Sequence, residues 1–487
     1  MIFLKKIKES SPASKAAIAF FISTLITKGI AYLTTPIYTR LLTTEEYGQV
    51  SVYLTWMQVF GIVAMFCLSY GVFNNGMVDY PDKRDDYSFS MLILSNIITI
   101  SFFGVVLALY PLISSFLDMD IPLLILMLVI FLVQPAYNFW CVRQRYEYKY
   151  KMVLVWSIAG AILSPLVAVV LLLTNKTGSN IYPRIFGAEC VLIIIYLGFY
   201  IFLGFKNRWK IHPKYWKEAL LFNLPLIPHY LSMYLLGSSD RIMISHLVGR
   251  SQAAFYSVAS SVATVAIIMW TAVNSSLIPF SYEKCREHNY SAINKVALPL
   301  LGVFALGCVS IIMFAPEVVW LMSTSEYMEA IYVIPPIVGG VFFQAQYYLY
   351  ANILYYYKKP LYVMFGSLTA VSLNIVLNYF CIKHWGYLAA GYTTIVCYGI
   401  QALIDAIAMR FAVKEKVYNF KIIILLSLTV VSISIISVLF YNLRIVRYCI
   451  FALILILIII FIKKIIRVFN FSKKPDDVNS CEDTGNS

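Results

Sequence analysis

Apolar stretches of about 18 residues or more recur along the whole of this chain, and each is long enough to cross roughly 30 Å of hydrocarbon as a helix. Of the 487 residues, 61% are hydrophobic and only 13% are charged, against about 25% charged in soluble domains. Segments of a transmembrane barrel are only about 10 residues long and alternate in polarity. The sequence therefore predicts an all-α integral membrane protein.

We expect fourteen transmembrane helices. The first apolar run is longer than the core of a signal peptide and lacks a small-residue cleavage site, so it should remain in place as the first helix. The expected spans are 16–39, 48–73, 88–110, 121–141, 152–174, 185–205, 218–247, 253–280, 293–315, 330–356, 361–381, 387–410, 421–441 and 446–466.

The basic residues predict how these spans are oriented. If the N-terminus is cytoplasmic, 29 of the 38 lysines and arginines fall in inner segments and seven in outer loops. By the positive-inside rule, we then expect the protein to lie in the cytoplasmic membrane with both termini in the cytoplasm. The net charge of +14 thus reflects membrane orientation, and we expect membrane lipids rather than nucleic acid as partners.

The connections are short and leave no room for a soluble catalytic domain. A weak internal repeat aligns Arg40–Val52 with His246–Val258, which suggests two related halves. We therefore predict an N-terminal six-helix bundle at 1–217, a C-terminal six-helix bundle at 218–416 and two additional transmembrane helices at 417–468. A disordered cytoplasmic tail is expected at 469–487.

The first span carries a lysine near its middle. A charge at that depth costs about 2.5 to 3.5 kcal/mol, so Lys28 is expected to face a cavity, with Tyr32 and Thr35 on the same polar side and Pro36 as a candidate hinge. Snorkelling of Lys28, or pairing within the bundle, is the alternative.

The seventh span is too polar to face lipid. It holds His229, Asp240 and Arg241, together with Pro225 and Pro228, which can bend the helix. Asp240 and Arg241 are adjacent and point about 100° apart, so they need not pair with each other. Lining a cavity and making structural contacts with neighbouring helices are equally compatible with these residues.

The tenth span combines Pro335 and Pro336, two further hinge candidates, with amides and tyrosines. Gln344, Tyr348 and Asn352 suit a sugar, since aromatic rings cover its apolar faces while amides and phenols bond its hydroxyls. The tyrosines at 355–357 fit an interfacial aromatic belt instead.

No catalytic motif is found. The cysteines are scattered singly, with no metal-ligand spacing, and there is no P-loop and no Ser/His/Asp arrangement. Glu189 and Asp405 each lie within about two turns of an arginine, Arg184 and Arg410, and we expect interfacial ion pairs there. We predict no enzyme activity, no cofactor and no metal site, and coupling to H⁺ or Na⁺ stays open.

The chain resembles the polysaccharide-transporter family of bacterial repeat-unit flippases of the Wzx type, within the multidrug/oligosaccharidyl-lipid/polysaccharide exporter superfamily. The resemblance rests on Ser23–Ala31, Pro36–Gly48, Ser239–Ile244 and Tyr256–Ala259. It implies two pseudo-symmetric six-helix bundles around a central cavity and alternating access. It also implies transport of undecaprenyl-pyrophosphate-linked oligosaccharide repeat units for O-antigen, capsule or exopolysaccharide synthesis.

A cationic cavity suits a pyrophosphate, with Lys28, Arg241 and Arg40 as the expected contacts. A polysaccharide polymerase and a chain-length regulator would be the protein partners. A flippase for peptidoglycan precursors or a drug exporter of the same superfamily is the nearest alternative. A membrane polysaccharide polymerase or glycosyltransferase is less favoured because it would need a large outer catalytic loop, and a purely structural scaffold is less favoured still.

Overall fold

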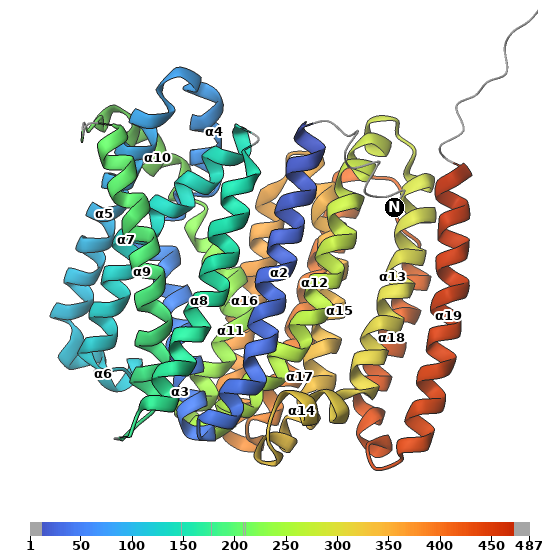
Figure 1. Ribbon diagram of the computed structural model, residues 1–487. Helices are drawn as coiled ribbons and strands as arrows, with labels where there is room; N and C mark the ends of the chain where they lie inside the picture. The colour runs from blue at the N-terminus through green and yellow to red at the C-terminus, as the bar shows by residue number, and fades with distance from the viewer. Residues whose placement is uncertain (1–11, 148, 177, 208, 210, 472–487) are drawn as a thin grey trace, which may run out of the picture. The chain divides into compact units, whose positions relative to one another are not determined.

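The computed structural model describes residues 12–147, 149–176, 178–207, 209 and 211–471, with side chains described within 23–457 apart from residue 24 and the same gaps. Every regular element in these ranges is a helix (Figure 1). Of the predicted tail, residues 472–487 lie outside the described part, and residues 469–471 belong to the last helix, α19 (Arg444–Phe471).

Thirteen of the fourteen predicted spans coincide with a helix, with a helix and its 3₁₀ extension, or with a bent pair of helices. The span predicted at 48–73 is too long, because the helix there ends at Ala64 and a turn follows it. Among the described residues, nine helices are long and apolar enough to cross a membrane, or eleven when each bent pair counts as one span. Three further long helices, α2 (Pro12–Leu41), α3 (Thr44–Ala64) and α19, fall on the remaining predictions. The all-α, multi-pass membrane fold is therefore confirmed.

The chain forms two compact units. Unit 1 comprises the residues up to Val258 together with Trp320–Met328 and Ile375–Ala390, and unit 2 comprises the rest. Unit 1 thus includes helices that the repeat assigns to the second predicted bundle, and the division at 217/218 stays a prediction.

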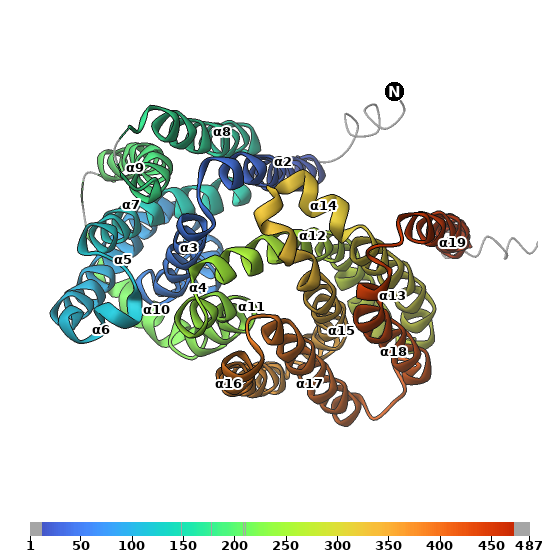
Figure 2. The ribbon, with the colours of Figure 1, turned by 90° about the horizontal axis from the view of Figure 1, so that it is seen from below.

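In unit 1, α2 packs against α8, and α7, α8 and α9 pack together (Figures 1 and 2). α3 packs against α11 and α5 against α7. Besides α2 and α3, the helices of this unit are α4 (Gly71–Asp79), α5 (Arg84–Ala108), α6 (Tyr110–Leu117), α7 (Ile121–Tyr146), α8 (Tyr150–Thr174), α9 (Ile181–Lys206), α10 (Trp216–Asn223), α11 (Ile227–Leu247) and the start of α12 (Arg250–Arg286). Short 3₁₀ turns, η1 (Pro81–Lys83) and η2 (Pro213–Tyr215), precede α5 and α10.

The two segments aligned by the sequence repeat meet at the starts of α3 and α12. α3 begins with a capping box, in which the Thr43 side chain accepts from the Glu46 amide and the Glu46 carboxylate accepts from the Thr43 amide. A Cβ on Gly48 would lie 1.9 Å from the Arg250 carbonyl oxygen, so the absence of a side chain lets the two helices touch. The Arg250 guanidinium pairs with Asp118 at 2.7 Å.

In unit 2, α13 packs against α15, α18 and α19. The helices are the rest of α12, α13 (Tyr290–Met313), α14 (Ala315–Met322), η3 (Ser325–Tyr332), α15 (Ile334–Tyr356), α16 (Pro360–Trp385), α17 (Leu388–Val413), α18 (Phe420–Ile436), η4 (Ser437–Phe440) and α19, with short parts of α14, η3, α16 and α17 belonging to unit 1. Arg447, only 2% exposed, holds α19 in place by pairing with Glu317 and donating to the Met313 carbonyl.

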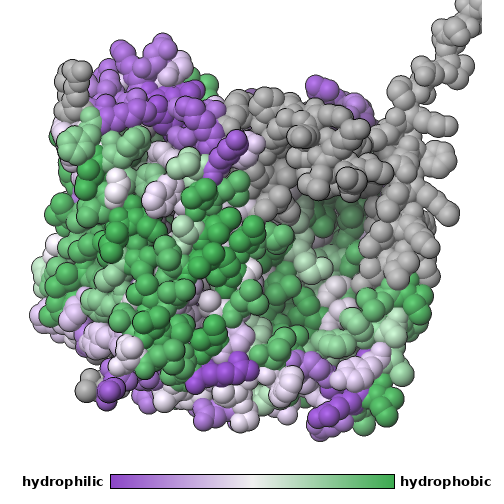
Figure 3. All heavy atoms as spheres, viewed as in Figure 1, coloured by the Kyte–Doolittle hydropathy of each residue, from purple (hydrophilic) through white to green (hydrophobic). Residues whose placement is uncertain are grey.

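The surface of unit 1 matches a bilayer. On the face in Figure 3, apolar side chains cover the middle of α8 and α9, and hydrophilic residues gather at the helix ends. Leu163, Leu166 and Val170 of α8 are all exposed. An exposed apolar belt of this kind is stable only in contact with lipid.

Candidate transport site

Two of the three regions that the sequence predicts as hinges contain a bend between consecutive helices. The turn at Leu224–Leu226, which contains Pro225, separates α10 from α11, and the two helix axes differ by 53°. Pro228 lies in the first turn of α11, where its missing N–H is tolerated. Pro335 lies in the first turn of α15, next to Pro336, after a 48° bend from η3. Pro36, by contrast, lies inside the continuous helix α2. Whether any of these bends moves stays a prediction.

Asp240 of α11 is the centre of a buried hydrogen-bond network in unit 1. Its side chain is 1% exposed, and its carboxylate accepts from the Tyr256 hydroxyl of α12 and the Asn378 amide of α16. Buried carboxylates are stable in a membrane helix when donors of this kind surround them. Asp240 therefore makes the structural contacts that one of the two sequence interpretations describes.

Arg241 lies beside Asp240 but points elsewhere. Its side chain is half-buried, and its buried Nε atom has no hydrogen-bond partner among the described residues. No carboxylate of the described part lies within 4.0 Å of it as an ion pair. An arginine left with donors to spare at membrane depth is suited to an anionic ligand.

The candidates of the first span take different positions on α2. Lys28 is exposed, Tyr32 is half-buried, and Thr35 is buried and donates to the Ala31 carbonyl of its own helix. Arg40 is exposed and donates to the Pro36 carbonyl at 2.8 Å. Lys28 forms no ion pair with any described residue.

The remaining candidates divide between the two units. His229 of α11 belongs to unit 1 and packs its ring against that of Tyr230. Gln344, Tyr348 and Asn352 of α15 belong to unit 2. Gln344 and Tyr348 are half-buried, whereas Asn352 is buried and donates to the Asn274 side-chain oxygen at 2.8 Å. Asn352 is thus tied to α12.

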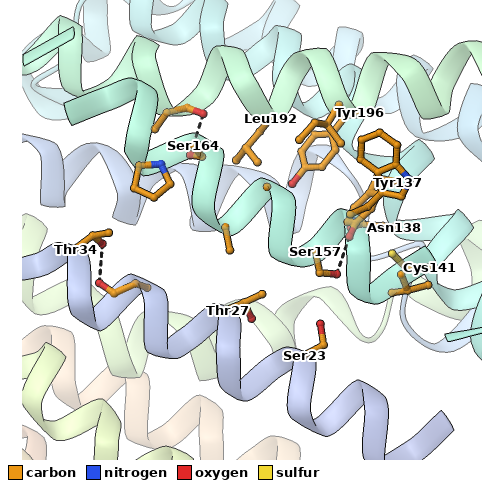
Figure 4. A pocket seen from close by; sticks show the side chains of 18 of the residues that line it. Ser23, Thr27, Thr34, Tyr137, Asn138, Cys141, Ser157, Ser164, Leu192 and Tyr196 are labelled. Atoms are coloured by element: carbon orange, nitrogen blue, oxygen red, sulfur yellow. Dashed lines mark hydrogen bonds between the residues drawn. The ribbon is translucent and has the colours of Figure 1, made fainter. Parts of the chain in front are cut away.

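A cavity of about 510 Å³ lies inside unit 1 between α2, α7, α8 and α9. Ser23 and Thr27 of α2, Tyr137 and Asn138 of α7, Ser157 of α8 and Tyr196 of α9 line it (Figure 4). Tyr137 and Ser157 share a hydrogen bond of 2.9 Å, and Arg145 and Arg184 also border the space. Hydroxyls, an amide, aromatic rings and guanidinium groups in one cavity suit a polar, hydroxylated ligand.

The sequence interpretation did not identify this cavity. On α2 it chose the side of the helix that carries Lys28, whereas the cavity is lined by Ser23, Thr27, Thr34 and Tyr38 on another side. The spacing of these four residues was a usable signal. The contributions of α7, α8 and α9 depend on packing that no spacing within one helix reveals.

The expected interfacial ion pairs of Glu189 and Asp405 are wrong. Glu189 is 7% exposed and its Oε2 atom has no hydrogen-bond partner among the described residues, while the guanidinium of Arg184 lies over the Tyr38 ring instead. Asp405 is 0% exposed, and its predicted partner Arg410 is exposed. Proximity along a helix did not bring these charges together because the acidic side chains turn into the protein.

Comparison with known proteins identifies the family. The model of the polysaccharide biosynthesis protein family matches residues 14–283, more than half of the chain. The chain belongs to this family. The chain is also similar to protein 1 of the Lsg locus of Haemophilus influenzae, which is 22% identical over 377 residues and is matched over 71% of this chain and 85% of its own length.

Solved structures share the fold of this family member. The lipid II flippase MurJ in an inward closed conformation is 14% identical, with a TM-score of 0.67 over 93% of this chain and 100% of its own. An inward-facing multidrug resistance MATE transporter of the MOP superfamily, also 14% identical, gives a TM-score of 0.59 over 82% and 99%. The chain therefore shares the all-α membrane fold of these two transporters.

Among the described residues, no three His, Cys, Asp or Glu side chains converge on a point where a metal ion could bind.

Proposed function

We propose that this transporter moves undecaprenyl-pyrophosphate-linked oligosaccharide repeat units from the inner to the outer leaflet of the cytoplasmic membrane by alternating access. The observation that carries the proposal is Arg241, a guanidinium in a membrane helix of a polysaccharide biosynthesis family member, with a buried Nε that no described residue accepts. A pyrophosphate offers the acceptors that this group lacks.

Lys28 is the second contact in this proposal. It is exposed on α2 and unpaired with any described carboxylate, so it is available to a substrate phosphate. The hydroxyl-lined cavity of unit 1 supports a carbohydrate substrate, because aromatic rings and hydroxyls are what recognises sugar faces and edges. Both termini would be cytoplasmic, and the polymerase and chain-length regulator of the same surface polysaccharide would act on the product.

The test compares lipid-linked saccharides and surface polysaccharide in a deletion strain carrying different variants. We expect the deletion to accumulate single repeat units on the inner leaflet and to lose surface polymer. Lys28→Ala and Arg241→Ala should each restore export poorly at normal protein levels, whereas Lys359→Ala, an exposed lysine after α15, should restore it fully. Full export by both Lys28→Ala and Arg241→Ala contradicts the assigned roles, and unpolymerised units reaching the outer leaflet of the deletion strain contradict the flippase.

A flippase for the peptidoglycan lipid precursor is the second candidate, because MurJ, a lipid II flippase, shares the fold over nearly the entire chain. Loss of the protein would then arrest cell-wall synthesis and growth. Normal growth of the deletion strain, with only surface polysaccharide lost, would reject this candidate.

A further inference from the structure

Asp405 is a fully buried carboxyl group without a counter-ion. It lies on α17 eight residues before the helix ends at Val413 and seventeen after it begins at Leu388, about 12 Å and about 25 Å along the axis. It is 0% exposed. Neither carboxyl oxygen has a hydrogen-bond partner among the described residues.

The surroundings of this carboxyl contain no compensating charge. No described Lys, Arg or His forms an ion pair with it, and Arg410, just over one turn further along α17, is exposed. From α15, the titratable group on which its charge would act is Tyr347. From α16 it meets a backbone position, Gly366.

The packing makes room for the carboxyl group itself. A Cβ on Gly366 would lie 2.9 Å from one oxygen of Asp405 and 3.3 Å from its carboxyl carbon, which is closer than ordinary contact. Gln401, also 0% exposed, precedes Asp405 by one turn on the same side of α17. The missing side chain at Gly366 thus leaves the space that the Asp405 carboxyl group occupies.

An ionised carboxylate in such a place would lose its hydration without gaining a partner, so the neutral, protonated form is the stable one. Asp240 shows the contrast, since two donors bond its carboxylate. The surroundings of Asp405 therefore favour the neutral carboxyl, and those of Asp240 favour the carboxylate.

We propose that Asp405 is a proton-binding residue of this transporter. Its carboxyl group holds a proton in the described state and releases it to water when another state of the cycle opens unit 2 beside α17. The coupling of this release to substrate movement rests on the proposed function; the binding of the proton does not.

Infrared spectroscopy of the purified full-length protein tests proton binding without a substrate. We expect the carbonyl band of a protonated carboxyl at neutral pH in the wild type and in Glu415→Gln, a control at an exposed carboxylate beyond the end of α17. Each protein is also measured with Glu189→Gln added, because Glu189 is a second buried carboxyl with an unpartnered oxygen and would contribute a band of its own. In that background Asp405→Asn should lack the band, and Gly366→Ala should shift its frequency, because the added methyl displaces the carboxyl. Absence of the band in the Glu189→Gln protein, its persistence when Asp405→Asn is added, or its loss on adding Na⁺ would overturn the proposal.

Reconstituted vesicles test the coupling. With extracted lipid-linked oligosaccharide as substrate, we expect an imposed pH gradient to change the translocation rate of the wild type and Glu415→Gln several-fold and that of Asp405→Asn not at all. A gradient response retained in Asp405→Asn refutes the coupling. Should the wild type move no substrate while the infrared band is present, the proposed function fails and proton binding stands.

Discussion

At the scale of single residues, buried polar groups distinguish the roles of this protein's helices. Asp240 accepts hydrogen bonds from Tyr256 and Asn378 while 1% exposed. Asp240→Ala removes the acceptor of both buried donors, and a lost buried hydrogen bond costs about 1 to 3 kcal/mol. We expect a clearly lower thermal unfolding midpoint in detergent, with a smaller loss for Asp240→Asn, which keeps an acceptor. Equal midpoints for Asp240→Ala and the wild type would contradict this.

A second residue-scale prediction concerns acid stability at the end of α7. Burial alone would raise the pKa of Glu147, but hydrogen bonds from Lys149 and Arg143 outweigh burial and lower this pKa to about 2. A depressed pKa stabilises the folded state above the ordinary value of 4.5, and the contribution is lost as pH falls from there towards about 2.

We therefore expect Glu147→Gln to be less stable than the wild type at pH 7, by a difference that stays constant down to about pH 5 and shrinks below it. Thermal unfolding of both proteins across this range measures the difference. If the stability difference between the wild type and Glu147→Gln grew as the pH fell, the pKa of Glu147 would not be lowered in the folded state.

At the scale of elements, the close contact between α3 and α12 depends on one glycine. Gly48→Ala would push a methyl group into the Arg250 backbone, whereas Gly29→Ala on α2 meets nothing within 4 Å. Alanine favours a helix over glycine by about 1 kcal/mol. Gly29→Ala should thus unfold at an equal or higher temperature, and Gly48→Ala at a distinctly lower one. Equal effects of the two substitutions would mean that the contact is unimportant.

The bend between α10 and α11 gives a functional prediction at the same scale. Pro225 lies in the turn between the helices, and replacing it with alanine restores a backbone donor that favours a continuous helix. We expect Pro225→Ala to lower surface polysaccharide export several-fold at normal protein levels. Pro122→Ala, in the first turn of the unbroken helix α7, is the control and should export normally. Wild-type export by Pro225→Ala would contradict a role of this bend as a hinge in transport.

At the scale of the whole molecule, the basic residues predict the orientation in the membrane. A reporter active only in the cytoplasm should work when fused after Phe471, and one active only outside should work when fused after Lys176, in the loop that follows α8. If the reporter that is active only outside worked when fused at the C-terminus, the predicted orientation would be wrong, and the direction of transport proposed above would be wrong with it.

The sequence by itself determined that the chain is all-helical and where its long apolar helices lie. Hydrocarbon requires about 20 apolar residues per helix, and this requirement is local, so thirteen of the fourteen predicted spans coincide with helices or bent helix pairs. The prolines at 225, 335 and 336 likewise located two bends, because a missing backbone donor acts within its own helix.

Only the tertiary structure decided what the polar residues inside those helices do. By sequence, Asp240 and Asp405 are both aspartates near an arginine, yet one accepts two hydrogen bonds and the other accepts none from any described residue. The cavity behind Ser23 and Thr27 needs three further helices to exist. Pairing and burial depend on neighbours distant along the chain, and a periodic pattern within one helix carries no information about them.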